Sequence, residues 1–264
     1  MELERPVAIK KQVLLVGETW VTSATHIKGF DPFYSATFHS GAGPLIAALR
    51  DSDFELTHMS GHDCAAQFPS TLEGLRQYDA IILSDIGANT LLLHPDVWLH
   101  SRPAPNRLKL LRDWTFEGGG LIMAGGYLSF QGIDGRARWR GTPVEAALPV
   151  TCLPQDDRIE VPDGFHPEVA EPEHPVLQNL SGTWPLLLGA NEVTARLRGD
   201  CSVLVKMPDD EGGHPLLVVG EWGAGRTAAW MSDISPHWAP AEFVNWAGYT
   251  TLWRNILGWI TQPK

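Results

Sequence analysis

The sequence predicts an α/β protein with a mostly parallel sheet and helices on both faces. Short apolar runs bounded by glycine or polar turns recur along the chain, as buried strands require. Segments with helical spacing of apolar residues separate these runs. Strands that alternate with helices form parallel sheets with right-handed crossovers, and functional groups gather at the carboxyl edge. The three clearest runs are Gln12 to Gly17, Asp79 to Ser84 and Leu121 to Ala124.

In the first third of the chain, the strand at Gln12 to Gly17 leads directly into Glu18. The next thirty residues are polar and glycine-containing, and the sequence predicts a long, lid-like loop there. A helix is expected around Leu45 to Arg50, and a second strand at Phe54 to Met59. This order matches a βαβ unit with an extended first connection.

The middle of the chain carries clear helix signals. Ser70 with Glu73 three residues later predicts a capped helix that runs to Gln77. Asn106 to Glu117 has helical apolar spacing, and Gly118 follows as a stop. Pro143 in the first turn predicts a further short helix.

The last part of the chain is harder to interpret. Pro149 to Pro175 is rich in proline and acidic residues and is expected to form irregular surface. Three strand-like stretches then precede an amphipathic helix at Phe243 to Ile260. We therefore expect one domain over residues 1–264, with an added C-terminal β-rich portion. The strand-like stretches are Cys201 to Met207, Pro215 to Gly220 and Arg226 to Met231.

Composition excludes several classes of function. There are 31 acidic and 20 basic residues, for a net charge of -11, and the longest basic run is Lys10-Lys11. Nucleic acid and anionic membranes are thus disfavoured as partners. The first twelve residues lack the apolar core of a signal peptide, and no long apolar run follows, so a cytoplasmic location is expected. The three cysteines have no zinc-site spacing, and no cofactor is predicted.

Polar side chains follow several of the predicted strands. Glu18 follows the first strand, Asp85 the third, Tyr127 the fourth, and Asp233 with His237 the last. Parallel strands bring such residues to one edge of the sheet. Strand ends are also polar simply because they meet water, so any one of these residues alone favours no site. Together they predict a cleft.

Three segments resemble the class I glutamine amidotransferase-like superfamily, whose fold is flavodoxin-like. More narrowly, they are similar to its branch of cytoplasmic proteins named "putative glutamine amidotransferase". The resemblance covers nearly the whole chain and implies that fold, with a site at the carboxyl ends of the strands. Fold alone does not fix the chemistry. The segments are SDIGAN at residues 84–89, GGGLIMAGGYLSFQG at 118–132 and EWGAGRTAAWMSDISPHW at 221–238.

The resemblance also locates a missing nucleophile. Amidotransferases of this superfamily carry a G-x-C-x-G elbow, and laid on this chain its cysteine position is Tyr127 between Gly125 and Ser129. A thiol ionises near pH 8.5, whereas a phenol ionises near 10 and is a poorer nucleophile. Neither Ser129 nor Cys152 lies in a nucleophile elbow. Glutamine hydrolysis through a thioester is therefore not expected.

The preferred hypothesis is a hydrolase-like or isomerase-like enzyme acting on a small polar metabolite. Tyr127 would donate a proton or hydrogen bond, His237 would act as general base or acid, and Asp233 or Glu18 would orient it. Asp85 opposes an oxyanion and suits a hydroxyl-rich or cationic ligand. The candidate ligand-binding residues are Asp85, Asn89, Gly126, His26 and Trp238.

Other interpretations remain open at this point. A non-catalytic ligand-binding or assembly module is the alternative, and a true glutamine amidotransferase is the least favoured. No compact metal motif is present in the sequence, so a metal site is not predicted. Exposed aromatic and proline-rich surface favours a homo-oligomer.

Overall fold

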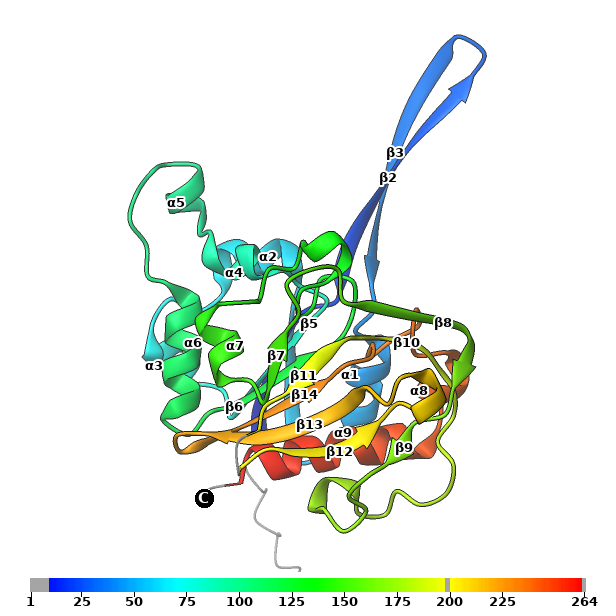
Figure 1. Ribbon diagram of the computed structural model, residues 1–264. Coiled ribbons are helices and arrows are strands. Elements are labelled where there is room, and N and C mark those ends of the chain that lie inside the picture. Colours follow the sequence, from blue (N-terminus) through cyan, green and yellow to red (C-terminus); the bar gives the residue numbers. More distant parts are fainter. Residues whose placement is uncertain (1–9, 198–199, 263–264) are drawn as a thin grey trace, which may run out of the picture.

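The structure, a computed structural model, describes residues 10–197 and 200–262, so residues 1–9 of the N-terminal segment considered above for a signal peptide lie outside the described residues. Within that part, the largest sheet has eight strands in the order β4-β1-β5-β6-β14-β13-β12-β9 (Figure 1). The strands are β1 (Lys11–Gly17), β4 (Phe54–Met59), β5 (Ala80–Ser84), β6 (Gly120–Ala124), β9 (Glu168–Val169), β12 (Ser202–Lys206), β13 (Pro215–Trp222) and β14 (Gly225–Trp230).

The first five strands in this order pair in parallel, and the last three continue the sheet in antiparallel fashion. Strands β5 and β6 are buried at every position because helices cover both of their faces. The prediction of a mixed α/β fold with a mostly parallel central sheet is confirmed. This arrangement aligns the carboxyl ends of β1, β5, β6 and β14 along one edge.

Helices form two groups. α1 packs against α9, while α2, α4, α6 and α3 pack in a chain of contacts with one another. The chain moves from β1 outward to β4 and then back across to β5, so right-handed crossovers place these groups on opposite faces (Figure 1). The helices are α1 (Gly43–Leu49), α2 (Gly61–Gln67), α3 (Leu72–Leu75), α4 (Ala88–Leu92), α5 (Pro95–Trp98), α6 (Arg107–Phe116), α7 (Pro143–Ala147), α8 (Ala241–Val244), α9 (Ala247–Ile260) and short 3-10 turns at Ile133–Gly135, Pro175–Leu177 and Asp209–Glu211.

The prediction of a lid-like loop after Glu18 is wrong. The segment forms a hairpin of β2 (Thr19–Lys28) and β3 (Asp31–Ser40), joined by ten residue pairs, that projects from the body as an arm (Figure 1). Its strands are rich in β-branched and aromatic residues, and Gly29 supplies the positive φ of 62° that the tight turn needs. Polar residues that alternate along both strands concealed this pattern from a search for buried runs.

The expected irregular surface at Pro149 to Pro175 also needs correction. It contains three strands, one of which belongs to the main sheet. The other two, β7 (Val150–Cys152) and β8 (Arg158–Phe165), pair with β11 (Val193–Ala195) and β10 (Leu187–Asn191). These pairings are between segments far apart in sequence, which local patterns do not reveal.

Two helix boundaries differ from expectation. Thr71, not Ser70, caps the short helix, because its hydroxyl accepts a hydrogen bond from the Gly74 amide at 3.1 Å. The C-terminal helix is interrupted at Trp246, which has an extended backbone and separates α8 from α9. None of the helices in the described part of the chain combines the length and apolarity needed to cross a bilayer.

Candidate functional site

A cavity of about 600 Å³ opens where the strand ends converge. It contains all five residues that the strand-end pattern brought together. Four strands therefore contribute to one site, as a parallel sheet predicts. The lining residues are Glu18, Trp20, Asp85, Tyr127, Leu128, Ile133, Arg136, Asp233, Ser235, Pro236 and His237.

The backbone at these strand ends is bent sharply. Glu18 and Asp85 adopt positive φ angles of 53° and 43°, a left-handed conformation that costs about 1–2 kcal/mol for such residues. The Glu18 amide donates to the Ser84 carbonyl at 3.0 Å, which fixes the first bend. Gly126 has a φ of 138°, and a Cβ there would lie 3.0 Å from an oxygen of both Asp85 and Asp233. Glycine at 126 thus lets the chain pass between two carboxyl groups.

Glu18 is almost completely buried, with 3% of its surface exposed. Ser84 Oγ donates to its Oε1 at 2.5 Å, and Ser235 Oγ lies 3.4 Å from Oε2. Burial, followed by the charge of Asp85, raises the pKa of Glu18 from 4.5 to about 8, although the serine hydrogen bonds oppose the shift. Glu18 is therefore a neutral acid at pH 7, able to donate a proton.

Asp85 lies beside this acid and is itself perturbed. Its Oδ1 accepts a hydrogen bond from the Leu128 amide at 2.7 Å, and its own amide donates to Ser129 Oγ at 3.1 Å. Burial raises the pKa of Asp85, and the charge of Asp233 adds to the rise. The site therefore holds three carboxyl groups at close quarters, a crowding that favours protonation of at least one.

His237 and Asp233 form a hydrogen-bonded pair. His237 Nδ1 lies 2.9 Å from Asp233 Oδ2, which also accepts the Trp238 amide at 3.0 Å. The hydrogen bond to Asp233 raises the pKa of His237, although burial opposes it. The pair fixes the ring so that Nε2 is the nitrogen not held by Asp233, the geometry of an oriented base.

Tyr127 lies with its ring edge-on to His237, at 4.4 Å between centroids. Its hydroxyl donates to Glu160 Oε1 at 3.2 Å, and the Arg158 guanidinium sits 5.1 Å from its ring centre. Burial raises the pKa of Tyr127, and the charge of Glu160 adds to this. The phenol therefore keeps its proton and is suited to donating hydrogen bonds rather than to nucleophilic attack.

Two further predicted residues, Gly126 and Trp238, are held by hydrogen bonds near the cavity. The Gly126 amide donates to Asn191 Oδ1 at 3.0 Å, and the buried Trp238 ring donates from Nε1 to Glu160 Oε2 at 3.0 Å. Neither residue is among those that line the cavity. Their contacts hold the turn and the Glu160 carboxylate in place.

The structure does not bring Asn89 and His26 to the site. Asn89 is exposed in the first turn of α4, and His26 lies on the arm, where its Nε2 is 3.0 Å from Ser35 Oγ. His26 lies away from the cavity because the segment that was expected to be a loop is a strand of the outward arm. Neither one lines the cavity.

Sequence reasoning missed four residues around the site. Ser84 was treated only as the end of a strand, and Ser235 had no motif. Glu160 and Asn191 lie on the paired strands β8 and β10, whose pairing was unexpected. Only Ser84 had a usable signal, since a polar residue ending a buried strand faces the same edge as its neighbours.

Neither a metal cluster nor a thiol is found in the site. In residues 10–197 and 200–262 no group of three or more His, Cys, Asp and Glu side chains could hold a metal ion. Cys64 and Cys152 are buried, which raises the pKa of both thiols, and neither lines the cavity.

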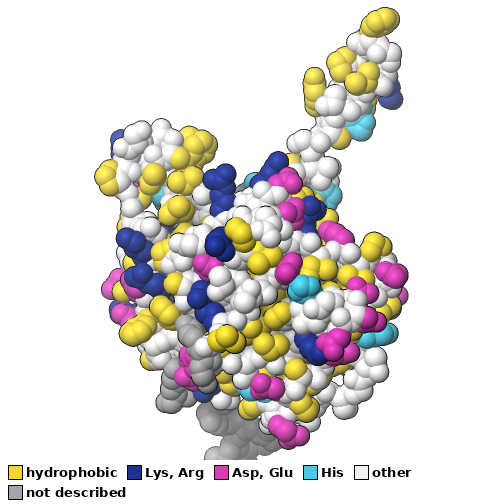
Figure 2. Space-filling model, viewed as in Figure 1, with side chains coloured by type: hydrophobic (Ala, Val, Ile, Leu, Met, Phe, Trp, Pro, Cys, Tyr) yellow, Lys and Arg dark blue, Asp and Glu magenta, His cyan; other side chains and the backbone are white. Residues whose placement is uncertain are grey.

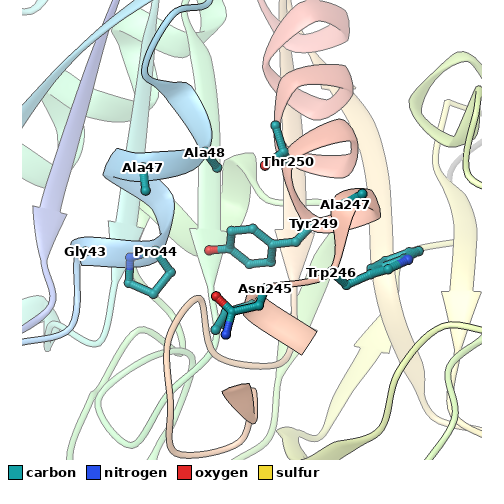
Figure 3. Close-up of a pocket in the computed structure, with 10 residues that line it drawn as sticks. Gly43, Pro44, Ala47, Ala48, Asn245, Trp246, Ala247, Tyr249 and Thr250 are labelled. Carbon is teal, nitrogen blue, oxygen red and sulfur yellow. The ribbon is translucent and has the colours of Figure 1, made fainter. Parts of the chain in front are cut away.

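A second hollow of about 470 Å³ lies between α1 and α9 (Figure 3). Small and apolar side chains such as Pro44 and Ala48 line it together with Asn245, and the Tyr249 ring lies between the two helices. The Tyr249 hydroxyl donates to the Ile234 carbonyl at 2.7 Å. No charged residue lines this hollow, so the chemistry favours the strand-end cavity.

The chain belongs to the family described as GATase1_like, "Putative glutamine amidotransferase", whose model matches residues 12–262. The resemblance stated from the sequence is therefore confirmed. Among curated proteins, none matches this chain in sequence.

Solved structures agree with this membership. Cytoplasmic Protein STM3548 from Salmonella typhimurium is 40% identical, with a TM-score of 0.88 over 94% of this chain and 98% of its own. Cytoplasmic Protein STM1381 from Salmonella typhimurium LT2 is 39% identical, with a TM-score of 0.89 over 95% of this chain and 100% of its own. A ThuA-like protein from Bacteroides uniformis is 14% identical, with a TM-score of 0.56 over 96% and 94%. This last likeness shows the fold alone.

Proposed function

We propose that this chain is an enzyme that acts on a small polar metabolite by general acid–base catalysis, as a hydrolase or isomerase. The observation that carries the proposal is a neutral acid and an oriented base in one cavity. Glu18 has a pKa raised to about 8, and His237 is held by Asp233 at 2.9 Å. A carboxylic acid that keeps its proton at pH 7 and an imidazole oriented by a carboxylate are groups that general acid–base catalysis uses.

Each residue takes a role from its contacts. His237 would accept a proton at Nε2, with Asp233 stabilising the imidazolium that forms. Glu18 would donate a proton, a more specific role than the orienting one considered from the sequence. Tyr127 would offer a hydrogen bond from the cavity wall, with Glu160 fixing its direction.

The absence of thiol chemistry is part of the proposal. The resemblance in sequence implies that Tyr127 stands at the position of the amidotransferase cysteine, and the buried Cys64 and Cys152 lie outside the cavity-lining residues. A glutamine-mimicking electrophile should therefore label no cysteine, and glutamine should release no ammonia. Stoichiometric labelling of one cysteine, together with ammonia release, would instead support glutamine amidotransferase activity.

The lining also indicates the class of ligand. Asp85 and Asp233 supply acceptors, Arg136 a cation, and Trp20 with Ile133 apolar walls. A volume of about 600 Å³ lies within the range of small-molecule sites. These features favour a hydroxyl-rich or cationic metabolite.

The test is turnover of a fractionated metabolite extract, followed by mass spectrometry. The wild-type protein should deplete one compound, and His237→Ala should abolish that depletion while its melting temperature stays near the wild-type value. His100→Ala, an exposed histidine away from the cavity, serves as the matched control. Binding of a compound without depletion would instead support the non-catalytic module.

The finer architecture belongs to this proposal as well. We regard the chain as a single domain, with the antiparallel strands β12 and β13 as the β-rich portion expected near the C-terminus. A cytoplasmic location is in keeping with the name of the two Salmonella relatives.

A further inference from the structure

The β2–β3 arm presents two faces of different character. Alternate residues of each strand share a face, and the ten cross-strand pairs assign them. On the first face, Trp20 stacks on His39 at 5.1 Å, His26 stacks on Phe33 at 4.4 Å, and the Lys28 ammonium lies 5.6 Å from the Phe33 ring. Side chains on this face thus contact one another within the arm.

The second face, here called the apolar face, has no charged residue. It pairs Val21 with Phe38, Thr25 with Tyr34 and Ile27 with Pro32, around the small pair Ser23 and Ala36. Its larger side chains toward the tip are exposed, with Tyr34 at 76% and Ile27 at 74%, whereas Phe38 near the root contacts His62 of α2 at 5.5 Å between ring centroids. Figure 2 shows apolar side chains along the arm and at its tip, where Phe30 is fully exposed.

Exposure of this apolar face to water is energetically unfavourable for a monomeric chain. An isolated two-stranded ribbon is marginally stable in water, and both of its edges offer unpaired backbone groups. The arm forms its own two-stranded sheet, separate from the main one. A covering partner would stabilise it by removing the apolar face from water.

We infer that the apolar face of the arm is covered by a second copy of this chain, each protomer contributing its arm to a two-fold interface. Ten paired residues give a ribbon about 33 Å long and about 10 Å wide. Each arm covers about 330 Å² of its own face and as much of the partner's surface. Two reciprocal arms therefore bury about 1,300 Å² in total, which is at the lower end of stable dimer interfaces.

Charge favours a second copy over the other occupants. Lys28 and Asp31 are the only formally charged residues between Thr19 and Ser40, so the arm is neutral on a chain of net charge -11. Contact through a neutral arm lets two acidic bodies associate without placing like charges against each other. An anionic membrane would need basic residues beside the apolar ones, and the arm offers only Lys28. A two-fold exchange also covers both arms at once.

Sedimentation of the full chain at micromolar concentrations tests this inference. The wild-type protein should be a dimer. Tyr34→Asp, which places a charge on the apolar face, should raise the dissociation constant by about tenfold or more. Thr37→Asp places the same charge on the opposite face of the same strand, and Leu197→Asp does so at a fully exposed site off the arm. Both controls should leave the dimer intact.

Each contrary result overturns the inference. A monomeric wild-type chain, or a dimer indifferent to Tyr34→Asp, removes the arm as the interface. Equal weakening by Tyr34→Asp and Thr37→Asp removes the assignment to the apolar face. If a monomeric chain bound vesicles and lost this binding with Tyr34→Asp, the apolar face would be a membrane-binding surface and not a dimer interface. Unchanged circular dichroism in all three variants shows that folding is not the cause.

Discussion

Replacing Glu18 with glutamine tests the central feature of the site, a buried acid that is neutral at pH 7. The substitution keeps the size of the side chain and an acceptor for the Ser84 hydroxyl, but it removes the ionisable group. The pKa of Glu18 is about 8 in the folded protein, against 4.5 in the reference state. The folded protein therefore holds this proton more tightly than the unfolded chain does.

The sign of the effect follows from that difference. Below pH 4.5 Glu18 is protonated in both the folded and the unfolded state, so its titration does not change the free energy of unfolding. Between pH 4.5 and about 8 the unfolded chain loses the proton first, so the free energy of unfolding falls as pH rises. One pKa unit corresponds to about 1.4 kcal/mol, so the loss between pH 5 and pH 8 is roughly 4 kcal/mol.

Urea denaturation of the wild-type protein and of Glu18→Gln across pH 5 to 8.5 measures this loss. The free energy of unfolding of the variant relative to wild type should rise by roughly 4 kcal/mol over the window, since other titrating groups are common to both proteins. Glu242→Gln, at an exposed glutamate on α8, is the control for the loss of one carboxyl group at the surface. A flat difference for Glu18→Gln would refute the assignment of a neutral acid.

Two further predictions concern the site, and a third concerns the packing of α6 against α2 and α4. Asp233→Asn should lower the pKa of His237, because the hydrogen bond to Asp233 is the largest cause of its rise; an NMR titration of the ring with an unchanged midpoint would contradict this. Gly126→Ala should cost about 1–3 kcal/mol in thermal unfolding, because it combines a φ of 138° with a Cβ pressed between two carboxyl groups; a wild-type melting curve would disprove the close approach. Arg107→Met should cost about 3 kcal/mol or more, because the buried guanidinium donates to the carbonyls of residues 64, 65, 90 and 91; a neutral effect on urea unfolding would show that these bonds add little.

Local sequence signals predicted the part of the molecule that local physics determines. The buried strands around residues 12–17 and 79–84 were found because helices cover both faces, which leaves an unbroken apolar run. Their order along the chain then placed Glu18, Asp85 and His237 at one edge without any knowledge of contacts. Parallel topology is thus a sufficient basis for predicting which strand-end residues line one cavity.

The same signals failed for strands that pair with distant segments, and for strands that join no larger sheet. β8 pairs with β10, almost thirty residues farther along. No local pattern around Glu160 therefore predicts that it accepts a hydrogen bond from the Tyr127 hydroxyl. The arm failed for the opposite reason. Its strands pair only with each other, and their polar alternation lacks the buried face that usually marks a strand.

The arm and the acid are structurally connected. The arm begins at Thr19, directly after Glu18, and returns at Gly41, whose amide donates to the Glu18 carbonyl at 2.9 Å. A Cβ at position 41 would lie 2.5 Å from Glu18 Oε2, so the returning strand closes tightly over the carboxyl group. Trp20, at the root of the arm, lines the cavity itself. The burial that keeps Glu18 protonated is therefore partly produced by the two roots of the arm, and the arm is as much a wall of the site as a projection from it.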